Sequence, residues 1–551
     1  GEGDEGEAEG DEDEDEEDEE DDDDDDDEVA EWNLRKCSAS GLDILAATFG
    51  QAILPTLLPL LQERLASTEW QVRESGILAL GAIAEGCIDD VQAYLPQLVP
   101  WLIQTLNEPK PLIRSITCWT LSRYSKWVVA KHSEGVTEND GYLRPLMQEL
   151  LKRVLDHNKK VQEAACSAFA TLEEDALLQL VPYLEPILQN LMFAFGKYQA
   201  KNLLILYDAI GTLADSVGSE LNQPNLVPLL MPPLVERWNT LADDDKGLLP
   251  LLECFTSIAQ ALGVGFQPYA QTVFTRCMAL MHATLAAEAR GEEGDKEFVV
   301  CSLDLISGMT EGMHGSIEQL ITGSQLPQLL YQCMRDAQPD VRQSAYALVG
   351  DLAKNCIGTL RPGLSQYLPV LCEQLAPEFV SVCNNASWAI GEIAVKVGAE
   401  MQPYAEATLQ RLIPIVNRQN ESLNKSLLEN TAITIGRIGY VCPQLAALHL
   451  ETFVQAWCLS LRNIRDDIEK EHAFLGLCAM VKLNPRAPIN ALAQLCEALV
   501  SWQALPPPEL NELIRQILHG YKASIPPEQW QQFMASLHEG VTARLVERYQ
   551  L

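Results

Sequence analysis

The sequence predicts an all-α fold in which antiparallel helix pairs stack into a solenoid. The first observation is a pair of apolar phrases that recurs about every 40 residues. The second is the lack of the short apolar–polar alternation that strands show. The third is the length of 551 residues. One compact core seldom grows so large, whereas repeats stack without limit because each packs only on its neighbours.

The first phrase of each pair predicts an apolar helix with a proline at or near its first turn. Proline is tolerated there because the amide hydrogen that it lacks would have no helical partner. These predicted first helices span residues 53–65, 94–106, 180–192, 226–238 and 367–375.

The second phrase follows a short polar turn and predicts a longer helix. Val72 and Ile113 occupy the same place in successive phrases and are 41 residues apart, which fits the period of roughly 40–47 residues of HEAT repeats. A coiled coil is excluded because 30 prolines and 33 glycines would break its heptads. The predicted second helices span 69–86, 111–127, 159–175, 339–355 and 379–398.

Four segments stand outside this pattern. Residues 1–28 are almost wholly acidic and cannot bury apolar surface, so we expect them to be disordered, with the helical array covering 29–551. Polar loops are expected at 130–141 and 288–297, and a turn between helices at 417–424. The chain starts with Gly inside the acidic tract, which suggests the C-terminal piece of a larger protein.

The charge of the chain points to a basic partner. The formal net charge is −40, and roughly −17 remains when the acidic tract is left out. Nucleic acid is disfavoured as a direct ligand because phosphates need Lys and Arg. The 15 cysteines form no C-x-x-C pair and lie in apolar helices, which indicates buried thiols in a reducing compartment. No apolar run is expected to be long enough to span a membrane.

An acidic and aromatic face follows the second helices. In 159–175, Glu163, Ser167, Thr171 and Glu174 are spaced to share one helix face, opposite small apolar residues. Other second helices repeat the pattern, with Asp304 and Glu311 seven residues apart and Trp388 and Glu392 four apart in theirs. The remaining members of this face are Ile116, Trp119, Arg123, Asp208, Thr212 and Asp215.

Second helices line the inner surface of a solenoid, so these faces would join into a trough of carboxylates with indole rings between them. Carboxylates bind Arg through paired charge-assisted hydrogen bonds, and Trp faces accept apolar or cationic groups. On one helix such a face is more often only solvated surface. Its recurrence on neighbouring helices favours a site for an extended basic peptide.

Several phrases carry a resemblance to a known family: WNLRKCSA (32–39), RSITCWTLSRY (114–124), KNLLILYDAIGTLADSVG (201–218) and VCNNASWAIGEI (382–393). The chain resembles the transportin (karyopherin-β2) family of nuclear import receptors in the importin-β superfamily. The resemblance runs from the acidic tract to the C-terminus and covers the C-terminal half of such a receptor. The N-terminal repeats, which supply the main surface for the small GTPase Ran in that family, are missing.

The resemblance implies a binding groove for nuclear localisation signals that end in Arg and then Pro-Tyr. The Arg/Pro-Tyr end would bind within 29–300 and the upstream basic or hydrophobic end within 301–440, with C-terminal repeats in 441–551. The first part would use Asp43, Leu78, Ile116, Trp119, Arg123, Glu163, Ala164, Ser167, Thr171, Glu174, Asp208, Thr212 and Asp215. The second part would use Asp304, Glu311, Asp351, Trp388 and Ile433.

The resemblance also implies partners and localisation. The partners would be cargo proteins with such signals, RNA-binding proteins among them, together with Ran-GTP and nucleoporins, and the protein would shuttle between cytoplasm and nucleus. Residues 1–28 match the loop through which Ran-GTP expels cargo. Ser40 and Gly41 stand where the family pattern has Ala, and Val380 where it has Ile.

Other functions find less support in the sequence. Phosphate-loop, zinc-protease and nucleophile-elbow motifs are all missing, so we expect neither an enzyme nor a cofactor or metal site. The alternative is a HEAT-repeat scaffold of a multiprotein complex that works through its outer or rim surfaces. A chaperone of histones or other basic proteins, acting through residues 1–28, is a third possibility.

Overall fold

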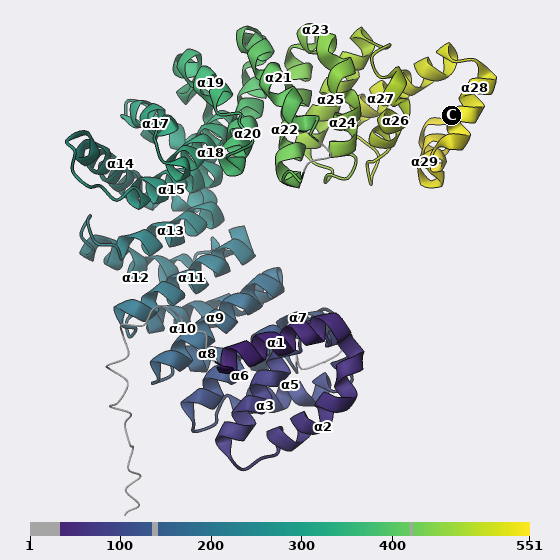
Figure 1. The fold of residues 1–551 in the computed structure, drawn as a ribbon. Helices are drawn as coiled ribbons and strands as arrows, with labels where there is room; N and C mark the ends of the chain where they lie inside the picture. The colour runs from purple at the N-terminus through teal and green to yellow at the C-terminus, as the bar shows by residue number, and fades with distance from the viewer. Residues whose placement is uncertain (1–33, 135–140, 419–421) are drawn as a thin grey trace, which may run out of the picture. The chain divides into compact units, whose positions relative to one another are not determined.

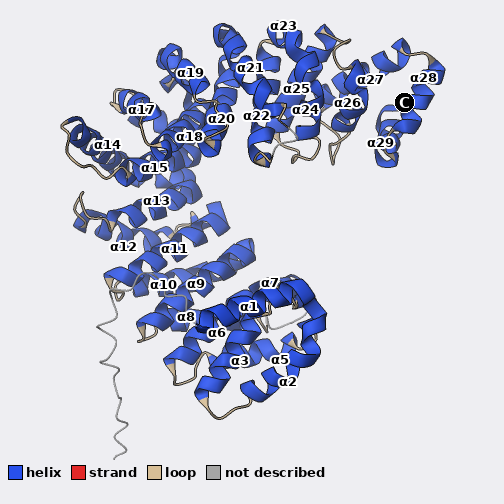
Figure 2. Cartoon of the chain, in the orientation of Figure 1, coloured by secondary structure: helices blue, strands red, loops and turns tan. Residues whose placement is uncertain are grey.

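The computed structural model describes residues 34–134, 141–418 and 422–551, and within these ranges the chain forms helices and no strand (Figure 2). The all-α prediction is therefore confirmed. The predicted disorder of residues 1–28 lies outside the described residues. Two compact units divide the chain, residues 1–168 and 169–551.

The first unit consists of short helices in which the second helix of each pair packs on the next pair. The second helices α3 and α6 pack on each other, while α2 and α5 cover them from the side of the first helices. α9 (Lys159–Ala176) crosses the boundary between the units. The other helices of the unit are α1 (Leu34–Phe49), α2 (Leu54–Leu65), α3 (Trp70–Ala82), α4 (Ile88–Val91), α5 (Leu95–Thr105), α6 (Pro111–Arg123), α7 (Ser125–Ser133) and α8 (Leu143–Val154).

The second unit contains a continuous row of second helices, each packed on the one before and the one after (Figure 1). This row positions the candidate residues of the unit, because α11, α15, α18, α20 and α22 carry Asp208, Asp304, Asp351, Trp388 and Ile433 in turn. Its members are α11 (Ala200–Val217), α13 (Leu248–Leu262), α15 (Glu297–Met313), α18 (Pro339–Cys356), α20 (Val380–Val397), α22 (Lys425–Val441), α25 (Ile468–Leu483) and α27 (Pro508–Ser524).

First helices form the other layer of this unit, and α17, α19, α21, α24 and α26 pack on one another in that order. Short helices α16 (Glu318–Ile321) and α23 (Pro443–Ala446) join pairs, and α28 (Pro527–Ser536) and α29 (Glu539–Tyr549) end the chain. The layer consists of α10 (Leu184–Phe195), α12 (Val227–Thr240), α14 (Gln267–Ala289), α17 (Leu326–Met334), α19 (Leu364–Glu373), α21 (Gln402–Val416), α24 (Leu450–Leu461) and α26 (Leu492–Leu499).

Side-chain hydrogen bonds between repeats keep the period of the sequence. Each joins residues about one repeat apart and satisfies a polar group where neighbouring helices meet. Examples are Thr120 Oγ1 to the Ile77 carbonyl at 2.9 Å, Arg114 Nε to Asp156 Oδ2 at 3.0 Å, and Asn385 Nδ2 to the Gln343 carbonyl at 3.0 Å.

A glycine near the middle of many second helices lets the next helix approach closely. A Cβ added at Gly436 would lie 2.7 Å from the Ala473 Cα, and one added at Gly391 would lie 3.1 Å from Thr434 Oγ1. At Gly436 a side chain would collide with the backbone of α25, and at Gly391 it would make a tight contact. Gly81 and Gly350 occupy the same place in α3 and α18.

Some details of the helix and loop predictions are wrong. The helix expected over 111–127 ends at Arg123, and α7 begins at Ser125, because Tyr124 leaves the helical conformation. Proline was expected at or near the first turn of every first helix, but Pro369 lies inside α19, beyond its first turn, because that helix begins earlier than predicted. The polar loop predicted at 130–141 is shorter at its start, since α7 continues to Ser133, and 135–140 lie outside the described residues.

The sequence predicts no apolar run long enough to span a membrane, and by length and composition alone this prediction is wrong. Two helical stretches, Leu34–Leu65 and Leu248–Ala289, are long and apolar enough to cross a membrane by those two measures. Each is interrupted by a short 3-10 segment that starts at a glycine with positive φ, Gly50 and Gly263. In the second stretch, 56% of the apolar window is buried inside the fold. The second stretch thus has the burial of a core helix, whereas 17% of the window of the first stretch is buried.

Candidate functional site

Trp119 forms an indole platform in the first unit. Its ring lies directly on the backbone of α3, since a Cβ added at Gly81 would be 2.4 Å from Trp119 Cζ3. The side chain is 37% exposed, so one part of the ring faces solvent. Arg123, one turn further along α6, places its guanidinium 5.7 Å from the ring centroid and donates from Nε to the Gly81 carbonyl at 3.2 Å.

Arg123 also joins the platform to two carboxylates. Its Nη2 lies 3.2 Å from Asp43 Oδ1 in α1, and its Nη1 lies 3.8 Å from Glu85 Oε2. Three predicted residues, Asp43, Trp119 and Arg123, are thus brought together. Leu78 is half-buried in α3, and Ile116 is buried in the interface between helices, so it offers little surface to a ligand.

The predicted division of faces along α9 is confirmed. The polar positions of one face are exposed or half-buried, and small apolar residues of the other face, such as Ala165, Ala168 and Leu172, are buried. On the polar face Glu163, Ser167 and Glu174 are exposed and Thr171 is half-buried; the apolar Ala164, which the resemblance also assigned to the site, is half-buried.

In the second unit, α11 presents the acidic face that was predicted, with Asp208 and Asp215 exposed and Thr212 half-buried. Partial desolvation by the neighbouring helices raises the pKa of Asp215, although a hydrogen bond with Ser257 opposes the shift. Glu173, next to the exposed Glu174, is fully buried, and neither of its oxygens has a hydrogen-bond partner. Burial and then the charges of Asp208 and Glu174 raise the pKa of Glu173 well above its usual range.

A cluster of carboxyl groups lies where α15 meets α18. Asp304 and Glu311 are exposed, whereas Asp351 is only 4% exposed and its Oδ1 has no hydrogen-bond partner. Burial and then the Glu311 charge raise the pKa of Asp351 to about 8, opposed by Ser307 and Lys354. Partial desolvation raises the pKa of Asp304 as well; a hydrogen bond with Ser344 opposes the shift and the Glu253 charge adds to it.

This cluster is short of positive charge. Glu311 Oε2 accepts a hydrogen bond from Gln260 Nε2 at 2.8 Å, which is a neutral donor. Lys354 is the one cation among the groups that shift the pKa of Asp351. Because burial and the Glu311 charge both disfavour ionisation of Asp351, a cationic side chain bound beside Glu311 would make that ionisation easier.

Trp388 forms the second indole platform, on α20. A Cβ added at Gly350 would lie 2.0 Å from Trp388 Cζ3, so the ring rests on the backbone of α18. The indole nitrogen donates to Glu469 Oε1 at 3.1 Å, from α25. Ile433 is buried on α22. Glu392, which was expected to share the exposed face of Trp388, is buried as well and pairs with Arg437 at 2.9 Å.

Sequence reasoning missed four residues of these platforms, namely Gly81, Gly350, Arg437 and Glu469. The two glycines carried a usable signal, because glycine recurs at the same place in successive second helices. Glu469 and Arg437 carried none, since their partners lie 81 and 45 residues away in the chain.

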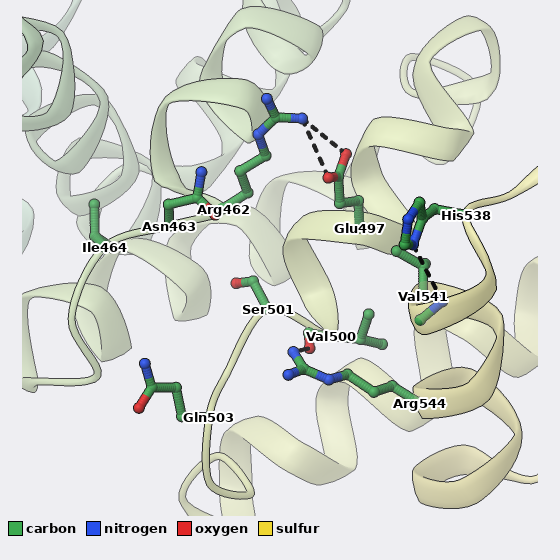
Figure 3. A pocket seen from close by; sticks show the side chains of 11 residues that line it. Arg462, Asn463, Ile464, Glu497, Val500, Ser501, Gln503, His538, Val541 and Arg544 are labelled. Carbon is green, nitrogen blue, oxygen red and sulfur yellow. Dashed lines mark hydrogen bonds and ion pairs between the residues drawn. The ribbon is translucent and has the colours of Figure 1, made fainter. Parts of the chain in front are cut away.

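A pocket near the C-terminal end lies apart from the predicted residues (Figure 3). Its charged groups are already used within the protein. Arg462 pairs with Glu497 at 3.1 Å, and Arg544 donates to the Val500 carbonyl at 3.0 Å. His538 Nδ1 accepts from the Gly540 amide at the start of α29. These contacts assign the side chains a structural role.

The described residues include neither a metal-binding cluster nor a reactive thiol site. No group of three or more His, Cys, Asp or Glu there is arranged to hold a metal ion. The cysteines are free, and all but Cys37 and Cys372 are buried. Burial raises the pKa of several of these thiols, to about 12 for Cys118 and Cys478, which keeps them protonated and unreactive.

Comparisons with known proteins place the fold. Residues 70–124 match the model of a HEAT-like repeat, and residues 126–359 match that of importin subunit beta-1-like TPR repeats. Importin beta crystallised in ammonium sulfate superposes with a TM-score of 0.64 at 15% identity, over 96% of this chain and 61% of that one. Yeast importin-beta gives 0.57 at 14% identity, over 96% and 60%. The architecture is therefore the HEAT-repeat solenoid of importin-β proteins.

Sequence relatives narrow this class. Transportin-1 of Homo sapiens is 54% identical over 95% of this chain and 58% of its own length. Transportin-1 of Oryza sativa is 53% identical over 93% and 59%. Transportin of Dictyostelium discoideum is 46% identical over 94% and 56%. The chain belongs to the transportin family and spans less than three fifths of the length of these relatives. Their names are those of transport receptors rather than enzymes.

Proposed function

We propose that this chain is the cargo-binding part of a nuclear import receptor, and that its second helices bind extended basic signals ending in Arg and Pro-Tyr. Membership of the transportin family supports the class of function. The observation that carries the proposal is the pair of indole platforms near carboxylates, Trp119 on Gly81 with part-exposed Asp43 close by, and Trp388 on Gly350 with part-exposed Glu469 at its N–H.

Each unit offers surface for a part of such a signal. In the first unit, Trp119 presents a partly exposed ring whose cationic neighbour Arg123 is already paired, which suits proline and tyrosine rings. In the second unit, the exposed carboxylates of α11 suit Arg, and the acidic cluster of α15 and α18 suits the upstream basic residues.

Release and transport follow from the same proposal. Ran-GTP would expel cargo through the acidic tract, because a polyanion competes with basic cargo for the same surface. Contact with nucleoporins would carry the receptor through nuclear pores between cytoplasm and nucleus. RNA-binding proteins with Arg/Pro-Tyr signals are the cargo class that we propose.

The test is fluorescence anisotropy with a labelled peptide that carries a basic upstream segment and an Arg/Pro-Tyr end. Submicromolar binding is expected for the wild-type chain. The double variant Trp119→Ala, Asp208→Ala should weaken it by about 100-fold or more, as for loss of central binding residues. Glu451→Ala is a matched control, since Glu451 is an exposed carboxylate on the first helix α24.

Two results would contradict the proposal. One is equal binding by the wild type and the double variant, with loss of both at moderate salt, because this is the behaviour of non-specific charge attraction. The other is no binding by the wild type at all. Either result would favour the HEAT-repeat scaffold. Circular dichroism of each variant separates loss of binding from loss of folding.

A further inference from the structure

Trp388 of α20 contacts two other second helices, α18 and α25, which are not consecutive in the chain. On one side the ring rests on Gly350 of α18. On the other its nitrogen donates to Glu469 Oε1, although α22 comes between α20 and α25 in the row of second helices. The ring is half-buried and leaves part of its surface in solvent. The packing on Gly350 restricts the ring to few rotamers, and the hydrogen bond to Glu469 adds a directional contact at the indole nitrogen.

Glu469 is itself held in place. Arg437 of α22 is 2% exposed and lies between two carboxylates, with Nη1 at 2.9 Å from Glu392 and Nη2 at 3.9 Å from Glu469. Glu469 lies in the first turn of α25, where a negative charge is favoured by the helix dipole. Two carboxylates therefore share one guanidinium, and the group keeps a net negative charge.

The geometry favours a cation on the free part of the ring. An indole that donates its N–H to a carboxylate gains electron density, which strengthens the attraction of the ring for a positive charge. Glu469 has 29% of its side chain exposed, so it can also face a bound cation directly. Arg437 is enclosed and cannot compete for the exposed part of the ring.

We infer that Glu469 positions Trp388 and gives this surface its preference for a Lys or Arg side chain of the ligand. Glu469 is a positioning residue that acts through the indole, and its charge adds to the recognition of the cation. This inference rests on the proposed function, because the cation is taken to belong to the upstream segment of a cargo signal.

The hydrogen bond is tested without ligand. Tryptophan labelled with ¹⁵N gives one indole N–H signal per residue, and Trp388→Phe identifies the signal of Trp388. Glu469→Ala should move that signal toward the position of a solvent-exposed indole. Glu469→Gln keeps an acceptor oxygen and should move it less. Glu471→Gln, in the same helix turn, is the control and should leave the signal unchanged.

The preference is tested with two peptides that differ only in the upstream segment, Lys and Arg in one and methionine in the other. Glu469→Ala should weaken the basic peptide about tenfold, as for loss of a cation–π contact and an adjacent charge, and the methionine peptide about twofold or less. Glu469→Gln should give an intermediate loss for the basic peptide. Glu471→Gln should bind both peptides as the wild type does.

The outcomes distinguish this inference from the proposed function. If the wild type binds neither peptide, the proposed function fails and the cation preference fails with it. If the wild type binds, Trp388→Ala weakens binding and Glu469→Ala does not, only the role of Glu469 is refuted. An equal loss for both peptides in Glu469→Ala would also refute it, because that pattern indicates general damage to the surface.

Discussion

The two indole platforms use the same packing and opposite electrostatics. Trp119 and Trp388 each rest on a glycine of the preceding second helix, Gly81 or Gly350. Trp119 has a guanidinium over its ring, whereas Trp388 donates its N–H to a carboxylate. The repeat therefore supplies the position of the ring, and residues from other helices decide what the ring attracts.

This difference predicts a direction for a bound peptide. The ring of Trp119 already has a cationic partner, so a second cation gains little there and an apolar ring gains more. Trp388 has a carboxylate at its N–H, and among the described residues no cation lies over its ring, so a cation gains more there. We therefore expect the apolar end of a signal to bind at Trp119 and its basic end to bind at Trp388.

The largest expected effect comes from filling the space beneath each ring. Gly350→Ala should displace Trp388 and weaken the basic peptide by about 30-fold or more, because the ring cannot stay where a methyl group now lies. Gly81→Ala should do the same to Trp119 and to binding of a short Pro-Tyr peptide. Anisotropy measures both.

The matched control for these variants is Gly520→Ala, since a Cβ at Gly520 meets nothing within 4 Å. Unfolding in urea should show a loss of about 1–3 kcal/mol for Gly81→Ala and Gly350→Ala. Equal loss of both peptides in both variants would break the comparison, because it would mean that the platforms do not act separately.

A smaller effect is expected from salt. Raising the salt concentration from 50 to 500 mM should weaken a basic upstream peptide about tenfold, because its charges face carboxylates that lack counter-ions. A short Pro-Tyr peptide should change by about twofold. Similar salt slopes for the two peptides would show that their electrostatic settings do not differ.

The smallest effect concerns pH. Because the pKa of Asp351 is raised to about 8, raising the pH from 6.5 to 8.5 ionises this group and should strengthen binding of the basic peptide about threefold. In Asp351→Asn this pH dependence should disappear, as shown by anisotropy over the range. A slope that persists in Asp351→Asn would assign the proton to another group.

The same group affects stability in the opposite sense. Its pKa is higher in the folded than in the unfolded state, so the folded state binds more protons between pH 4 and 8. The free energy of unfolding therefore falls as the pH rises through this window and levels off above it. Asp351→Asn should flatten that part of the stability curve.

Much of the fold could be predicted because each helix carries its own periodicity. The polar face of α9 was found from spacing alone, and Glu163, Ser167 and Glu174 are exposed as predicted. The break at Tyr124 was missed because apolar residues continue on both sides of it.

The site could be predicted only in part, because burial depends on neighbouring repeats. Asp351 and Ile433 were both expected to contact a bound signal at the surface. Both are buried, because neighbouring helices pack against α18 and α22. Glu469 could not be found from local spacing, since its partner Trp388 belongs to a helix two places back in the row. Whether these residues contact cargo remains a prediction.

Most helix–helix interfaces in the second unit join neighbouring second helices. A stretching force along the row would therefore separate these interfaces one by one. The link from Trp388 to Glu469 passes over α22, which Arg437 ties to both sides. Helices α20, α22 and α25 are thereby connected to one another by side-chain contacts. We expect these three helices to move as one stiff segment, and bending or stretching of the second unit to occur mainly in the repeats on either side of them.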